Sequence, residues 1–239
     1  MKFRAIAVSV AALISIATAG SLVSAAPAET MHLEGASNAR DVGGHRTTDG
    51  HMVRTGLVFR SNSLHRLTTA DLARLESARV RVVDDLRTGI ERTFQPDRVP
   101  ASVVSNSRDV FRQDLPMSAD AAYEVFISSP GANQAFAATL RDIISVEGAL
   151  LYHCTYGKDR TGWMTAVLLT VLGVDRASVN QDFLLSNARL DDSDSVTQSN
   201  LDTSFNLAIS TYGSFDDYVH EGLGLTDAEI TTLKAKQLV

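Results

Sequence analysis

Hydrophobic and polar positions along the chain fall into short apolar runs separated by longer amphipathic stretches. Apolar runs at residues 56–60, 80–83, 101–104 and 149–153 predict short buried strands. Between the third and fourth run, Phe136, Leu140, Ile143 and Ile144 follow the i, i+4, i+7, i+8 spacing of a helix with one apolar face. Strands that alternate with helices predict an α/β fold with a central, mostly parallel sheet flanked by helices.

Several helix ends carry local signals in the sequence. Thr68 with Asp71 three residues later predicts a helix start, and Thr226 with Glu229 repeats the pattern near the end of the chain. Asp175 is predicted to cap another helix. Residues 190–204 are polar and acidic, which predicts a surface loop or a mobile lid.

The segment 162–172 is apolar on nearly every face, so the helix predicted there must be buried. It follows the predicted strand 149–153, and Cys154 lies at the turn between the two. We find neither an internal repeat nor a linker, so one domain is expected after the N-terminal segment.

The first residues have the pattern of a secretory signal peptide. Lys2 and Arg4 precede an apolar stretch at residues 5–18, and small residues follow up to Ala28. We predict a signal peptide over residues 1–28, cleaved after Ala25 or Ala28, and a domain over residues 29–239. An uncleaved anchor is the alternative, but the apolar run is short for a membrane span. Export to the cell envelope or medium is expected.

Charge and cysteine content narrow the class of ligand. Of the 22 Lys and Arg residues, two lie in the signal segment; the remaining 20 against 28 Asp and Glu leave a net charge of −8. This balance argues against nucleic acid as the partner but permits a phosphorylated ligand, which needs positive potential only locally. Cys154 is the one cysteine, so the chain has no internal disulfide and carries a candidate reactive thiol.

The run at residues 153–162, His-Cys-Thr-Tyr-Gly-Lys-Asp-Arg-Thr-Gly, predicts a phosphate site. In a strand–loop–helix arrangement the loop amides and the helix N-terminus form a cradle for a phosphoryl group. Thiols in such places ionise readily, which makes Cys154 the candidate nucleophile. Arg160 offers a planar fork for two phosphate oxygens. The other expected substrate-binding residues of the run are Thr155, Tyr156, Gly157, Lys158 and Thr161.

These residues resemble the signature of the protein tyrosine phosphatase superfamily, and more narrowly that of the bacterial tyrosine/serine phosphatases. Further segments agree over residues 31–239: Asn38-Ala39-Arg40-Asp41-Val42-Gly43-Gly44, Phe59-Arg60-Ser61, Asp85-Leu86-Arg87 and the ending from Tyr212 to Leu225. The resemblance implies a single-domain phosphatase fold and hydrolysis of phosphotyrosine, with phosphoserine or phosphothreonine as further substrates, through a phosphocysteine intermediate. It also implies phosphorylated proteins or lipids as partners, phosphoinositides being the alternative substrate class.

The general acid has two candidates, and proton transfer of this kind contributes about 10²–10⁴ in rate. The resemblance favours Asp159 inside the loop, whereas Asp85 at a strand end is the rival or else an ion-pair partner. Lys158 is either a solvated lysine or a second phosphate-binding cation. Arg40 and Arg87 either add positive potential or pair with Asp41 and Asp85.

His153 is expected to orient the loop rather than to act as a base. The other histidines form no compact ligand pattern, so we expect neither a metal nor a cofactor. A rhodanese-type sulfurtransferase and a phosphate-binding pseudophosphatase are the alternative readings of the cysteine loop.

Overall fold

The computed structural model describes residues 31–112 and 114–239, which contain a five-stranded sheet in the order β1-β2-β5-β3-β4. The strands are β1 (Arg40–Asp41), β2 (Val58–Ser61), β3 (Val80–Asp85), β4 (Val104–Ser107) and β5 (Ala149–His153). Strand β1 runs antiparallel to β2, and the other pairs are parallel. The predicted mostly parallel sheet is therefore confirmed.

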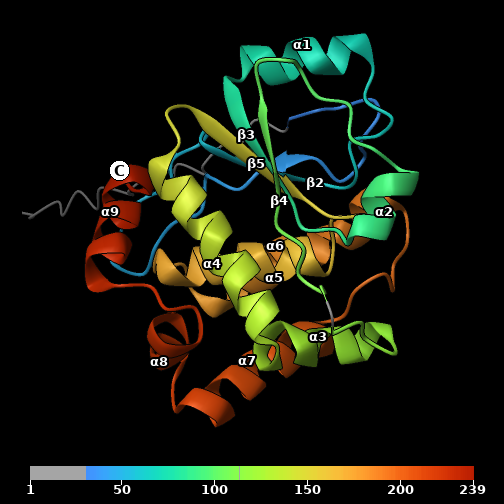
Figure 1. Ribbon diagram of the computed structural model, residues 1–239. Coiled ribbons are helices and arrows are strands. Elements are labelled where there is room, and N and C mark those ends of the chain that lie inside the picture. The colour runs from blue at the N-terminus through green and yellow to red at the C-terminus, as the bar shows by residue number, and fades with distance from the viewer. Residues whose placement is uncertain (1–30, 113) are drawn as a thin grey trace, which may run out of the picture.

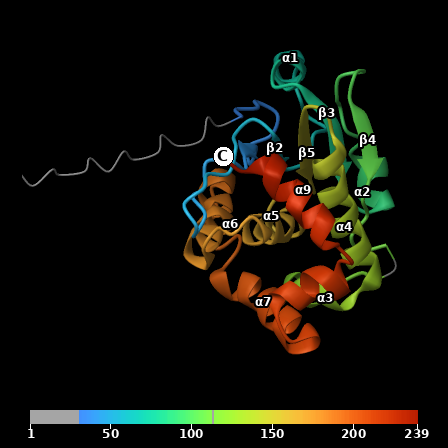
Figure 2. The ribbon, with the colours of Figure 1, turned by 90° about the vertical axis from the view of Figure 1, so that its left-hand side faces the viewer.

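Helices connect the parallel strands and continue after the last of them. They are α1 (Thr69–Ser77), α2 (Gly89–Phe94), α3 (Ala119–Ser128), α4 (Pro130–Ser145), α5 (Arg160–Val171), α6 (Arg176–Leu190), α7 (Gln198–Tyr212), α8 (Phe215–Asp217), the π-helical turn η1 (Tyr218–Gly222) and α9 (Asp227–Gln237). Figure 1 shows α1 above the sheet and the larger group of helices below and in front of it, and Figure 2 shows the same layers from the side.

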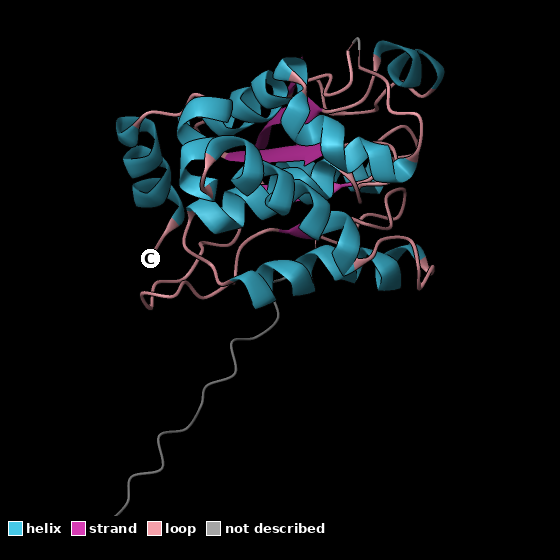
Figure 3. Cartoon of the chain, turned by 90° about the horizontal axis from the view of Figure 1, so that it is seen from below, coloured by secondary structure: helices cyan, strands magenta, loops and turns pink. Residues whose placement is uncertain are grey.

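Side chains on β5 alternate between two apolar cores, because successive residues of a strand point to opposite faces. Ala149 and Leu151 pack into the smaller core with Leu75 of α1. Leu150 and Tyr152 pack into the larger core among the helices α3 to α7. Seen from below, helices cover most of the sheet (Figure 3). The strand is thus buried on both faces, and Cys154, which follows its C-terminal end, lies inside the domain.

Most of the predicted element ends are confirmed. Thr68 and Thr226 form capping boxes, and the carboxylate of Asp175 accepts a hydrogen bond from the Ser178 amide at the start of α6. The predicted strand at 101–104 is displaced, since β4 begins at Val104.

The long polar loop predicted at residues 190–204 is wrong for its second half, because α7 begins at Gln198. A capping box of Thr197 and Asn200 starts this helix, and Leu201 and Ser204 are buried. The polar composition of this segment did not indicate a helix, although α7 forms one that packs mainly against α3.

Within the described ranges, the helices are all too short or too polar to cross a bilayer. The predicted signal peptide and its two cleavage positions lie outside the described residues.

Candidate active site

The phosphate loop, residues 154–160, connects the end of β5 to the start of α5 as predicted. Cys154 follows directly after the strand and is buried, and Arg160 is the first residue of the helix. Both flanking elements are buried almost throughout. The loop is therefore held at both ends by the core of the domain.

Three consecutive carbonyl groups of the loop, at residues 155–157, point outward to protein donors. In a trans peptide the N–H is opposite to the C=O, so the next amides, at residues 156–158, point to the inner side of the loop. Amides arranged in this way form the anion cradle that the sequence predicts. The contacts are Ser63 N to Thr155 O at 3.1 Å, Asn38 Nδ2 to Tyr156 O at 3.1 Å and to Gly157 O at 3.0 Å, and Arg60 Nη2 to Gly157 O at 2.8 Å.

Gly157 has the conformation that the loop needs and that a side chain would prevent. Its φ is +69°, and a Cβ there would lie 2.5 Å from Ser61 O and 2.6 Å from Asn62 N. Only glycine therefore fits this position without a shift of the neighbouring backbone.

The N-terminus of α5 carries no side-chain cap. Asp159 occupies the cap position, but its carboxylate accepts no amide of the helix. Instead, Tyr123 Oη donates to Asp159 Oδ1 at 2.7 Å. Burial raises the pKa of Tyr123 far above its ordinary value of 10, and the charge of Asp159 adds to this, so the phenol stays a neutral donor.

Arg160 is paired with Glu91 of α2, a residue that sequence reasoning missed. Arg160 Nη1 and Nη2 donate to the two carboxylate oxygens at 2.8 and 2.7 Å, and Thr155 Oγ1 donates to the same carboxylate. Burial alone would raise the pKa of Glu91, but the hydrogen bonds and charge of Arg160 outweigh it and lower the value far below its ordinary 4.5. The Thr88-x-x-Glu91 spacing, a capping box, was the available signal for this helix.

Lys158 and Thr161 flank the loop arginine. Lys158 Nζ donates to the carbonyl of Ser195, in the acidic segment between α6 and α7. Thr161 Oγ1 is buried and has no hydrogen-bond partner among the described residues. Tyr156 is 61% exposed and forms part of the rim of the loop.

Of the two roles expected for Arg40 and Arg87, the structure shows the ion pair: the predicted Arg87–Asp85 pair is confirmed, and neither guanidinium is placed as a substrate-binding group. Arg40 is buried and donates to Asp182 and Asn38, so its ion-pair partner is Asp182 and not Asp41. Arg87 is buried and donates to Asp85 and to other protein acceptors. Since all three nitrogens of each guanidinium are engaged, neither is available to a ligand.

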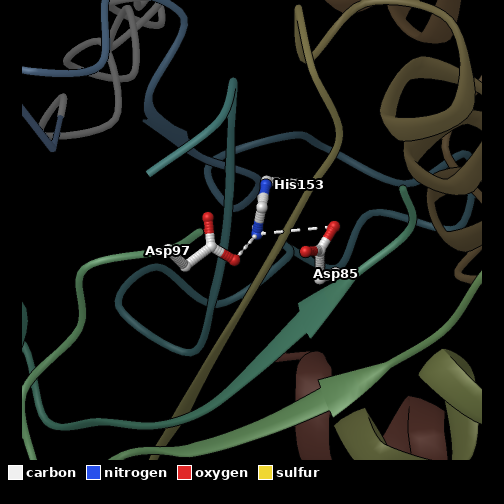
Figure 4. Close-up of side chains that lie close together, drawn as sticks. All are labelled: Asp85, Asp97 and His153. Atoms are coloured by element: carbon white, nitrogen blue, oxygen red, sulfur yellow. Dashed lines mark hydrogen bonds and ion pairs between the residues drawn. The ribbon is translucent and has the colours of Figure 1, made fainter. Parts of the chain in front are cut away.

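Asp85 belongs to a buried ion-pair network behind the loop. Its two oxygens accept from Arg87 Nε at 2.9 Å and Nη2 at 2.7 Å. Arg87 Nη2 also reaches Asp97 at 2.8 Å, and Asp97 Oδ2 lies 2.9 Å from His153 Nε2. Figure 4 shows the ring of His153 between the two carboxylates, with Asp85 the more distant at 3.9 Å.

This network offers three groups of the kind that bind metals, since ligand atoms of Asp85, Asp97 and His153 lie within 4.8 Å of one another. Arg87 already bridges the two carboxylates, however, so a metal ion would have to displace a buried guanidinium. His153 Nδ1 lies 3.3 Å from the carbonyl of Cys154. The arrangement connects the network to the loop and suits the orienting role expected of His153.

Comparison with known proteins identifies a family and several relatives of this chain. Its residues 31–239 match the sequence profile of the tyrosine phosphatase family. A protein of Cupriavidus necator, proposed by its name to be a tyrosine-protein phosphatase, is 29% identical over 81% of this chain and 84% of its own. The triple specificity protein phosphatase PtpB of Mycobacterium tuberculosis is 31% identical over 65% of this chain and 68% of its own.

Among solved structures, TpbA of P. aeruginosa, a cysteine-to-serine variant in complex with pTyr, aligns with 74% of this chain and 91% of its own. Its TM-score is 0.45 and its sequence identity 19%. The profile match covers all of the described residues and includes the cysteine loop, so the chain belongs to the tyrosine phosphatase family and is a cysteine-dependent phosphatase.

Proposed function

We propose that this enzyme hydrolyses phosphotyrosine in proteins, and phosphoserine or phosphothreonine more slowly, with Asp159 as its general acid. The observation that carries the proposal is the loop itself, in which three outward carbonyls turn the following amides toward a site between Cys154 and Arg160. The names of the Cupriavidus and Mycobacterium relatives support the substrate class.

The reaction takes two displacement steps. The thiolate of Cys154 attacks phosphorus, the bond from phosphorus to the ester oxygen breaks, and Asp159 protonates that oxygen as the alcohol leaves. Water then attacks the phosphocysteine, Asp159 accepts its proton, and the sulfur–phosphorus bond breaks to release inorganic phosphate. The loop amides and Arg160 stabilise the charge on the three phosphoryl oxygens in both steps.

The surroundings of the two acid candidates favour Asp159. Asp159 is half-buried at the helix start and accepts one hydrogen bond, from a neutral phenol. Asp85 is 4% exposed and both its oxygens are bound by Arg87. A carboxylate held by a guanidinium is a poor proton donor, because protonation would leave the cation without its partner.

Protein substrates suit the surface beside the loop. A polar cavity of about 540 Å³ is bordered by Thr155 and Tyr156 of the loop and by His65, Arg66 and Gln95 outside it. Such a cleft has room for polar residues that flank a phosphorylated side chain. Helix α2 in addition exposes two apolar side chains, Ile90 at 68% and Phe94 at 81%, a surface that would favour the alternative class, phosphoinositides in a lipid layer.

The test compares kcat/KM for a phosphotyrosine peptide, the matching phosphoserine peptide and a phosphoinositide in vesicles. We expect the phosphotyrosine peptide to be the best substrate and Cys154→Ser to abolish turnover of all three. A vesicle substrate at least tenfold better than the peptide would replace the proposal with the lipid alternative. Turnover that survives in Cys154→Ser would exclude the phosphocysteine route.

We further propose that the enzyme is exported. Lys2 and Arg4, the apolar stretch at 5–18 and the small residues before Ala28 support this destination. Expression of the full chain in a bacterium with N-terminal sequencing tests it. We expect an extracytoplasmic product that starts at Ala26 or Glu29; a cytoplasmic product that starts at Met1 would contradict the proposal.

A further inference from the structure

A buried cluster of three charged side chains lies against the outer side of the phosphate loop. Asp182 of α6 accepts from Arg40 Nε at 3.2 Å and from Arg60 Nη1 at 2.7 Å. All three residues are almost fully buried. Strands β1 and β2 and helix α6, which are far apart in sequence, therefore meet in one ion-pair cluster.

This cluster carries more positive than negative charge. Two guanidinium groups share the single carboxylate of Asp182. Burial together with the charge of Arg40 lowers the pKa of Arg60 only to about 10, so Arg60 stays charged at neutral pH. The loop residue Arg160, in contrast, is neutralised by Glu91 through two hydrogen bonds. Arg60 and Arg40 thus supply net positive charge at the outer side of the phosphate loop.

Arg60 connects the cluster to the loop directly. Its Nη2 donates to Gly157 O at 2.8 Å, while Asn38, itself oriented by Arg40, donates to the same carbonyl. These bonds hold the carbonyl away from the phosphate side. A buried cation bonded to the loop favours negative charge inside the loop.

We propose that Arg60 is a positioning residue of the reaction. Its guanidinium, on the outer side of the loop, fixes the Gly157 peptide, and its positive charge, which Asp182 balances only in part, stabilises the Cys154 thiolate. The inference rests on the cysteine-dependent chemistry of the family and not on the choice of substrate. Arg60 is not placed to contact substrate or the sulfur, so it acts through the position of the loop and through its own positive charge.

Other charged or titratable groups lie around the loop that follows the thiol. They are Arg160 and Asp159 at the start of α5, Glu91 of α2, Tyr123 of α3, His153 of β5 and, behind it, Asp85, Arg87 and Asp97. These groups are the same in wild type and in the Arg60 and Asp182 variants of the following experiment. A change in thiol ionisation between the variants therefore reports the altered cluster.

The experiment measures the rate of alkylation of the thiol by iodoacetamide against pH, together with kcat/KM on p-nitrophenyl phosphate. Cys154 is the only cysteine of the chain, so alkylation reports this thiol alone. In Arg60→Met we expect the alkylation midpoint to rise by about one pH unit and kcat/KM to fall about 100-fold. In Arg60→Lys, which keeps the charge, the midpoint stays within about 0.3 pH unit of wild type while kcat/KM still falls about tenfold.

The matched variant Asp182→Asn keeps the shape of the side chain and removes the negative charge. We expect its midpoint to fall by roughly half a pH unit, opposite to Arg60→Met. A purely structural role predicts an upward shift in both variants, because a loosened loop returns the thiol toward its free behaviour. Midpoints that rise in both would overturn the proposal.

Folding is checked by circular dichroism and thermal melting. If Arg60→Met does not fold, Asp182→Asn decides by itself, since only the electrostatic role predicts a downward shift. Alkylation needs no substrate, so a failure of the phosphotyrosine assignment leaves this test intact.

Discussion

Arg160 and Glu91 form a two-point ion pair in which both terminal nitrogens of the guanidinium meet both oxygens of the carboxylate, at 2.8 and 2.7 Å. The pair joins α5 to α2, elements that are 69 residues apart at this contact. The ring of Phe111 lies 4.8 Å from the guanidinium carbon and covers one face of it. Arg160 is thus held in one orientation before any substrate arrives.

Removal of the Glu91 charge should impair catalysis through the arginine. We expect Glu91→Gln to lower kcat/KM on p-nitrophenyl phosphate by about 10- to 100-fold, since a misplaced phosphate clamp loses transition-state contacts. Because Arg160 keeps the pKa of Glu91 well below its ordinary value, the loss should be the same from pH 5 to pH 8. Glu76→Gln on the exposed face of α1 is the control, and equal activities of the two variants would rule out this role.

Asp159→Asn tests the general acid. We expect kcat to fall about 10²- to 10³-fold on a phosphotyrosine peptide and much less on p-nitrophenyl phosphate, whose leaving group needs less protonation. Tyr123→Phe, which removes only the hydrogen bond to the carboxylate, should have a smaller effect. If Asp85→Asn, shown to be folded, has the stronger leaving-group dependence, the acid has been assigned to the wrong residue.

Gly157→Ala should disable the loop. The added Cβ meets Ser61 O at 2.5 Å in a left-handed backbone, so we expect a stability loss of about 1–3 kcal/mol and at least a 100-fold loss of kcat/KM. Gly56→Ala is a matched control, since Gly56 has φ +78° and none of the described residues lies within 4 Å of the Cβ that alanine would add there. Its activity should be unchanged; wild-type activity in Gly157→Ala would mean that the loop tolerates a different geometry.

Lys158→Ala should cost less than Arg160→Ala. Lys158 is half-buried and donates to the Ser195 carbonyl, so it fastens the acidic segment to the loop, whereas Arg160 supplies the planar fork. We expect losses in kcat/KM of about tenfold and at least 1,000-fold, respectively. Equal losses would indicate that Lys158 binds the phosphoryl group as strongly as Arg160.

Asp84 on β3 should make stability fall with rising pH. Burial, and next the charge of Asp142, raise the pKa of Asp84 from 3.8 to about 7 in the folded protein. A carboxyl whose pKa is higher when folded contributes stability that is complete below pH 4 and is lost as the pH rises to about 7. Asp84→Asn should therefore be more stable than wild type at pH 8 by about 1–3 kcal/mol, with little difference at pH 4.

Urea unfolding at the two pH values measures this difference. The buried Oδ2 of Asp84 has no hydrogen-bond partner among the described residues, so this oxygen carries an unsolvated charge when the carboxyl ionises at high pH. A variant less stable than wild type at pH 8 would show instead that Asn106 and Arg108 stabilise the ionised carboxylate.

Local patterns in the sequence determined the order of strands and helices, the buried helix from Arg160 and the cysteine at its start. These features depend on residues that are neighbours along the chain: apolar runs, caps such as Thr68 and Thr226, and the glycine at 157. Periodicity did not reveal α2, which is short and has no buried residue, or the start of α7 inside a polar segment.

The tertiary structure alone decided how charged residues that are distant in sequence are paired. The sequence predicted Asp85 as a partner for Arg87, but nothing local to Arg40, Arg60 or Arg160 identifies its carboxylate. The sheet order brings Asp182 of α6 to Arg40 and Arg60, and the crossover after β3 brings Glu91 to Arg160. The sequence motif singled out Arg160 as the candidate phosphate ligand. Because a buried charge is stable only beside its partner, the fold determined which carboxylate each arginine meets and that Arg60 contacts the loop.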